Sequence, residues 1–77
     1  MRREVKAERI TSLADIAYQK IKDDIIKNKL KPGEMIRSTQ IAEELNMSRT
    51  PIREAISSLE KEGLLETKNG VGVFVTE

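Results

Sequence analysis

Apolar residues recur at helical spacing over most of the chain and predict three helices. From Ala14 they fall at i, i+3, i+4, i+7 and i+11, on one stripe of an amphipathic helix that should end near Asn28. A second, short helix is predicted at about 39–45, and a third is expected from Ser48 to a stop at Gly63. The side chains expected to form the shared core are Ala14, Ala17, Tyr18, Ile21, Ile25, Ile41, Ala42, Leu45, Ile52, Ala55, Ile56 and Leu59.

Turn and capping residues separate these segments. The stretch Lys31-Pro32-Gly33-Glu34 has proline and glycine at the central positions of a type II turn, and only a very short strand fits at residues 35–36. Ser38 is the expected N-cap of the second helix, and Ser48 is that of the third. Asn46 lies between these two helices, where a tight connection favours a left-handed residue.

The end of the chain predicts a β-hairpin. Leu64 to Thr67 and Val71 to Thr76 are strand-like runs on either side of Lys68-Asn69-Gly70, and Asn-Gly between β-formers is a strong hairpin signal. The order of elements is that of a winged helix-turn-helix. We therefore predict a mainly α, α+β fold over residues 11–77, with three helices and a small antiparallel sheet that ends in a hairpin wing. Residues 1–10 are predicted to be a flexible tail.

Composition excludes several functions. The 77 residues include no cysteine and no histidine, so no disulfide, Cys/His zinc site or histidine-dependent nucleophile can form. The carboxylates are scattered over expected solvent faces, so no acid–base pair is predicted, and we expect neither an enzyme nor a bound cofactor or metal. The first ten residues are charged and no long apolar run occurs, which predicts a cytoplasmic protein without a membrane segment.

The charge balance gives no global sign of a nucleic-acid partner. Charged residues make up 35% of the chain, but the net charge is only +1. A positive surface must therefore be local, and the third helix offers one. If its apolar stripe faces inward, Arg49, Thr50, Arg53 and Ser57 project outward from its first turns, where the helix N-terminus attracts phosphate. Arginine can also bind guanine bidentately in the major groove.

Two further residues of this helix start fit DNA, but simpler explanations remain. The Ser48 hydroxyl can donate to phosphate, and the Pro51 ring could touch a thymine methyl or a sugar. A well-capped surface helix with solvated arginines would have the same residues. Lys68, Asn69 and Gly70 suit a minor-groove or backbone contact, although a plain hairpin turn would also contain them. Together the two features favour double-stranded DNA over the alternative, a winged helix used only for protein–protein contact.

Three stretches resemble the DNA-binding domain of the GntR family of bacterial transcription regulators, most closely its FadR-like branch. They are LKPGEMI (30–36), IAEELNMSRTPIREAISSLEKEGLL (41–65) and NGVGVFV (69–75). By this resemblance, several residues align with DNA-contacting positions of the recognition helix and the wing tip. These are Ser48, Arg49, Thr50, Arg53, Asn69 and Gly70.

The chain departs from its relatives at two positions. Many have an arginine where Thr39 stands, and often a basic wing residue where Val71 stands, so Arg37 is expected to take over one contact. The complete set of predicted DNA-binding residues is Arg37, Ser38, Thr39, Ser48, Arg49, Thr50, Pro51, Arg53, Ser57, Lys68, Asn69 and Gly70.

Acidic and leftover apolar residues are assigned other roles. Glu54 is expected to pair with a nearby arginine and fix its rotamer rather than contact a base. Glu60 and Glu62 are interpreted as solvated or intramolecular charges. Ile16 and Ile26 lie off the main stripe of the first helix and are either scattered surface residues or contacts to another domain.

The resemblance also concerns assembly. GntR-family members carry a further domain after the wing that binds an effector and forms the dimer, and this chain stops at Glu77. We therefore expect a full-length homodimer that binds a palindromic operator. The isolated domain, which has no heptad seam, is expected to be a monomer or weak dimer.

Overall fold

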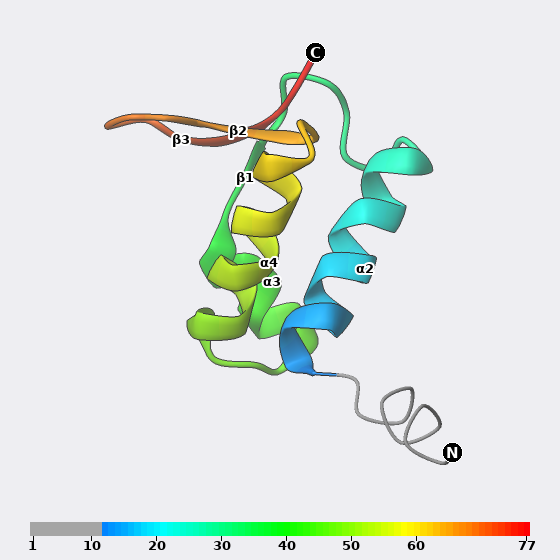
Figure 1. Ribbon diagram of the computed structural model, residues 1–77, viewed down its shortest axis with the longest axis vertical. Coiled ribbons are helices and arrows are strands. Elements are labelled where there is room, and N and C mark those ends of the chain that lie inside the picture. The colour runs from blue at the N-terminus through cyan, green and yellow to red at the C-terminus, as the bar shows by residue number, and fades with distance from the viewer. Residues whose placement is uncertain (1–11) are drawn as a thin grey trace.

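The computed structural model describes residues 12–77, so the predicted tail at 1–10 lies outside the described residues. The predicted order of elements is confirmed. Within the described residues, three helices and three strands follow one another as α2 (Leu13–Ile26), β1 (Met35–Ile36), α3 (Ser38–Leu45), α4 (Arg49–Lys61), β2 (Leu65–Lys68) and β3 (Gly72–Val75). Figure 1 shows the helices gathered on one side, with the β2–β3 hairpin projecting beyond them.

Helix α2 begins where its capping residue places it. The backbone N–H of Asp15 donates to Ser12 Oγ at 3.0 Å, which satisfies one of the free amides of the first turn. The helix ends at Ile26, slightly before the predicted Asn28, because Asn28 is left-handed at φ 62° and turns the chain. The next turn is confirmed as type II: Gly33 has φ 84°, and the N–H of Glu34 donates to the carbonyl of Lys31 at 2.9 Å.

The core lies where the helical stripes meet the sheet. The predicted stripe of α4 is confirmed, and the largest fully buried side chains are Ile21, Ile52 and Leu59. Tyr18, Ile25, Ile41 and Leu45 are partly buried against this core. The residues buried in it are Ala17, Ile21, Ile36, Ala42, Ile52, Ala55, Ile56, Leu59, Leu65 and Val75.

The connection from α3 to α4 is confirmed at its turn and corrected at its start. Asn46 adopts the predicted left-handed conformation, with φ 57°. The N-cap of α3, however, is Arg37 and not Ser38. Arg37 is extended, and its carbonyl already accepts from the N–H of Ile41 at 3.2 Å, so Ser38 is the first helical residue. No side-chain hydrogen bond caps α3.

The three strands form an antiparallel sheet in the order β1-β3-β2. Successive side chains of a strand alternate between the two faces. Leu65 and Val75 are paired and buried, so the face they share is directed to the helices, and Thr67 and Val73 form the next pair on that face. Lys68 and Phe74 therefore lie on the outer face.

The wing consists of β2, β3 and their connecting loop. Lys68 pairs with Gly72, which leaves a three-residue loop of Asn69, Gly70 and Val71. The N–H of Val71 donates to the carbonyl of Lys68 at 2.9 Å, and Gly70 has the positive φ, 78°. The predicted tight turn at Asn69-Gly70 is thus confirmed, but the loop is shifted by one residue from the predicted 68–70 to 69–71, and Asn69 is not left-handed.

Candidate nucleic-acid interface

A hollow of about 420 Å³ lies between the start of α3, the exposed side of α4 and the wing. We call it the α4–wing hollow. Ile36, Ile56 and Val73 contribute apolar surface to it. Its other lining residues are Met35, Arg37, Ser38, Thr39, Arg53, Ser57, Glu60, Val71 and Gly72. The hollow therefore brings together five of the predicted DNA-binding residues from two helices.

Helix α4 presents its polar side to this hollow because its apolar stripe is directed inward. Arg53 and Ser57 are exposed and line the hollow. Arg49 and Thr50 are exposed in the first turn of the same helix, outside the lining. The four residues predicted to project from α4 are thus all at the surface.

Neither arginine of α4 has an acidic partner within residues 12–77. One ion pair is recorded within residues 12–77, and it joins Lys20 to Asp24, so the predicted pairing of Glu54 with an arginine is wrong. The physical reason is direction: Glu54 lines a separate hollow between α2 and α4 together with Asp15 and Tyr18. The guanidinium groups are left to bind an external anion.

The start of α4 is open. Ser48 is the predicted N-cap and is extended and exposed, but its side chain makes no capping hydrogen bond. The first amides of α4 and the Ser48 hydroxyl are therefore available to an outside acceptor. Pro51 is buried, so the expectation that its ring meets a thymine methyl is corrected. Its ring packs inside the protein, and its missing N–H removes no helical bond.

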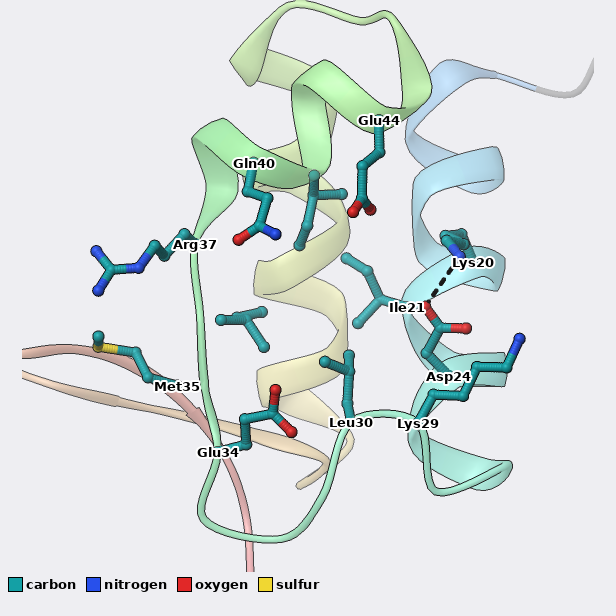
Figure 2. A pocket seen from close by; sticks show the side chains of 12 residues that line it. Lys20, Ile21, Asp24, Lys29, Leu30, Glu34, Met35, Arg37, Gln40 and Glu44 are labelled. Atoms are coloured by element: carbon teal, nitrogen blue, oxygen red, sulfur yellow. Dashed lines mark ion pairs between the residues drawn. The ribbon is translucent and has the colours of Figure 1, made fainter.

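The start of α3 forms the second side of the hollow. Arg37 is exposed, and Figure 2 shows its side chain directed away from the neighbouring pocket between α2 and α3. Ser38 and Thr39 follow it in the lining of the α4–wing hollow. Because no side chain caps α3, its first amides are also free to meet an anion there.

The helix-facing side of the wing borders the hollow. Val71, Gly72 and Val73 line it, whereas Lys68 does not. The Lys68 ammonium lies 4.8 Å from the centre of the Phe74 ring on the outer face of the sheet, a cation–π contact. Asn69 and Gly70 are exposed at the tip. Val71 is not among the residues predicted from the sequence for this site. Val71, Val73 and Val75 are spaced two residues apart, and this spacing could have indicated that they share the helix-facing side.

An acidic residue connects α4 to the wing. Glu60 is partly buried, lines the hollow and accepts a hydrogen bond from the Thr67 hydroxyl of β2. Its interpretation as an intramolecular charge is confirmed. This contact joins the last turns of α4 to the helix-facing side of the hairpin.

Two lysines of α2 make contacts within the protein. Lys20 Nζ lies 3.0 Å from Asp24 Oδ2, and this hydrogen bond and charge raise the pKa of Lys20. The Tyr18 hydroxyl donates to Glu62 at 2.7 Å, and Lys22 Nζ donates to the same hydroxyl at 3.3 Å, which raises the pKa of Lys22. Lys20 and Lys22 of α2 thus contrast with the arginines around the α4–wing hollow, which have no acidic partner in the described part of the chain.

A second hollow, of about 190 Å³, lies between α2, β1 and α3 (Figure 2). Its charged side chains are of both signs: Lys20 pairs with Asp24, and Glu44 is directed into the pocket (Figure 2). Over residues 12–77, no group of three or more acidic side chains is placed to hold a metal ion. In the same part of the chain, no helix has the length and apolar character needed to cross a membrane.

The sequence pattern of the family "Bacterial regulatory proteins, gntR family" matches residues 13–75. This chain belongs to that family. It is 44% identical over 59 residues to the uncharacterized HTH-type transcriptional regulator YdhC of Bacillus subtilis, covering 77% of this chain and 26% of that protein. It is 43% identical over 58 residues to the Uxu operon transcriptional regulator of Escherichia coli, covering 74% of this chain and 23% of that protein. The chain spans about a quarter of the length of these curated relatives.

Solved structures of DNA complexes share the fold. The DNA-binding domain of AraR in complex with operator ORX1 is similar with a TM-score of 0.81 and 28% identity, over 90% of this chain and 84% of that one. The complex with operator ORE1 is similar with a TM-score of 0.80 and 28% identity, over 87% and 83% of the two chains. The winged helix-turn-helix prediction is confirmed, and the chain is a GntR-type DNA-binding domain.

Proposed function

We propose that this domain binds a specific double-stranded DNA sequence as the DNA-binding part of a bacterial transcription regulator, with α4 in the major groove and the wing on the adjacent minor groove or backbone. The observation that carries the proposal is the grouping of Arg37, Arg49 and Arg53, none with an acidic partner among the described residues, around the open starts of α3 and α4. An unpaired, exposed arginine keeps its full capacity for a phosphate or a guanine.

In this proposal, α4 and the start of α3 make different contacts with the DNA. Arg49, Thr50, Arg53 and Ser57 reach base edges and phosphates of the major groove from the first turns of α4, with Ser48 donating to a phosphate at its N-terminus. At the start of α3, Arg37 with Ser38 and Thr39 holds a backbone phosphate, which fixes the register of α4 on the duplex.

The wing completes the contact surface. Asn69 and Gly70 approach the minor groove or backbone at the tip, because Gly70 has open space around its Cα where a side chain would stand. Lys68 lies on the outer face, so we assign it a phosphate beyond the tip and not a base edge. Pro51 is left out of the surface.

Assembly and location follow from the relatives. Because the matched proteins are transcriptional regulators about four times as long, we propose that the whole protein is a cytoplasmic homodimer that binds a palindromic operator through two copies of this domain. We place the whole protein within the FadR-like branch. No enzymatic role is proposed, since the matched family is one of regulatory proteins.

Selection from a random duplex library tests the proposal. The native chain should enrich one half-site motif, and its affinity for that motif should fall steeply as salt is raised, because released counterions drive phosphate contacts. Enrichment of no motif, or salt-insensitive retention of every duplex, would refute sequence-specific binding. It would favour the alternative, a winged helix that contacts proteins.

A further inference from the structure

One side chain of the α4–wing hollow does not fit a purely electrostatic DNA contact. Val71 is 65% exposed, yet it is branched and apolar and stands in a hollow with Arg53 and Ser57. The other side chains of the wing loop and its closing pair are polar or absent. Ile26 on α2 is similarly exposed, but Val71 differs from it in lying inside the proposed DNA surface, so bound DNA is a partner that it can contact.

The shape of the hollow indicates where that partner lies. With α4 in the major groove, the hollow between α4 and the wing is the place where the sugar–phosphate ridge between the two grooves can sit. Arg53 and Ser57 then stand on the major-groove side of this ridge, and Val71 stands on the minor-groove side. At the adjacent tip, Gly70 has no heavy atom within 4 Å of the position of a Cβ, so the loop can approach the groove closely.

We infer that Val71 is a specificity-determining residue of the wing, and that it selects A·T over G·C pairs at the minor-groove position next to the half-site. This inference rests on the proposed function. In the minor groove, A·T and T·A pairs present only acceptors, whereas G·C adds the guanine N2 amino donor. Val71 offers this amino group no acceptor and removes it from water, so a G·C pair leaves a buried donor unsatisfied.

Hydrogen bonds hold the backbone of the wing loop and join the hairpin to α4. The turn hydrogen bond from the Val71 N–H to the Lys68 carbonyl is 2.9 Å long, and Thr67 of the hairpin donates to Glu60 of α4. A valine has a single side-chain torsion, restricted by β-branching, so little entropy is lost when it enters the groove.

A three-way base substitution tests the inference. Selection with the native chain first gives the half-site and its flank, and selection with Val71→Thr identifies the flanking position whose preference changes. Three duplexes then carry A·T, G·C or inosine·C at that position. Inosine·C keeps the major-groove pattern of a G·C pair but lacks the N2 amino group.

The native chain should bind the A·T and inosine·C duplexes about equally, and the G·C duplex about fivefold or more weakly. Val71→Thr conserves the volume and adds a hydroxyl that can accept from the amino group, so the preference should fall to about twofold or less while affinity for the A·T duplex is kept. Ile26→Thr is the matched control, because Ile26 is 66% exposed on α2, and it should leave the preference unchanged.

Other outcomes would overturn the inference. A native chain that binds its half-site but does not distinguish the three duplexes would show that Val71 reads no base pair. An unchanged preference in Val71→Thr would do the same, provided that thermal melts show both variants folded. These results would leave the proposed function intact, whereas a native chain that enriches no duplex in the first selection would refute both.

Discussion

Replacing Arg53 by alanine should weaken specific DNA binding without weakening the fold. The side chain is exposed on α4, lines the α4–wing hollow and has no ion-pair partner within residues 12–77. Its removal therefore breaks no ion pair or side-chain hydrogen bond within these residues, and the free energy of unfolding should change by less than about 0.5 kcal/mol. A contact to guanine or phosphate, in contrast, contributes about 1–3 kcal/mol, which corresponds to a roughly 5- to 150-fold loss of affinity.

Fluorescence anisotropy with a labelled half-site duplex measures this loss, and the salt dependence assigns the contact. If Arg53 binds a phosphate, the slope of log affinity against log salt should fall by about one unit, with equal losses on all sequences. If it binds guanine, the slope should change little and the loss should vanish on a duplex that lacks that base.

Lys27→Ala is the matched control. Lys27 is an exposed basic residue that follows α2, outside the lining of the hollow, and its replacement removes the same unit of charge. It should leave affinity within about twofold, since exposed charges beyond a Debye length of roughly 8–10 Å are largely screened. Equal losses in Arg53→Ala and Lys27→Ala would refute the assignment of α4, because only total charge would then matter.

Four further outcomes are expected. Leu59→Ala, at a fully buried position, should cost about 2–5 kcal/mol and lower Tm in a thermal melt; an unchanged Tm would contradict the described core. Gly70→Val should cost about 1 kcal/mol or more, because φ is 78° there, and should weaken half-site binding; a variant with native Tm and affinity would show that the wing loop is wrong. The raised pKa of Lys20 means that its pairing with Asp24 stabilises the fold fully below its ordinary value of 10.5 and is lost as pH rises through the raised pKa. Lys20→Gln removes this pair, so its free energy of unfolding in urea titrations should fall less above that pH than that of the native chain. An unchanged alkaline profile would argue against the pair. Sedimentation at micromolar concentration should show a monomer, and a stable dimer would contradict this. In a DNA titration, the chain should bind a palindromic site no more tightly per domain than it binds a half-site.

The helices could be read from the sequence because the signals that form them are local. The stripe of α4 follows from the spacing of Ile52, Ala55 and Leu59, and the left-handed Asn46 follows from the need for a tight connection. Both depend on residues only a few positions apart, and burial against the rest of the chain reinforces them. The exposed polar side of α4 follows from the same periodicity.

The arrangement of the wing could not be read in this way, because it depends on register. The sequence predicts the tight Asn69-Gly70 turn correctly, but it places Lys68 in the loop and Val71 in the strand, whereas the Lys68–Gly72 pairing does the reverse. With side chains alternating between faces, this pairing places Lys68 outside and Val71 in the hollow. Long-range pairing across the sheet decides the register, and the turn residues alone do not.

Side-chain partners were also hidden from the sequence. Glu54 and Arg53 are neighbours in the chain, but successive helical residues point about 100° apart, so Glu54 faces α2 instead. The contact between Glu60 and Thr67 joins different elements, and the sequence indicated only that the charge could be intramolecular. The cap of α3 moved to Arg37 because the backbone becomes helical one residue earlier than the serine suggested.

An NMR titration of the labelled chain with its selected half-site duplex tests the central claim most directly, since each backbone amide reports its own surroundings. Shift changes should concentrate at residues 37–39, 48–57 and 69–71, which carry the proposed DNA-contacting side chains, and residues 22–28 at the end of α2 should stay unaffected. Changes concentrated on α2, or spread evenly over every exposed lysine and arginine, would contradict the proposed DNA surface.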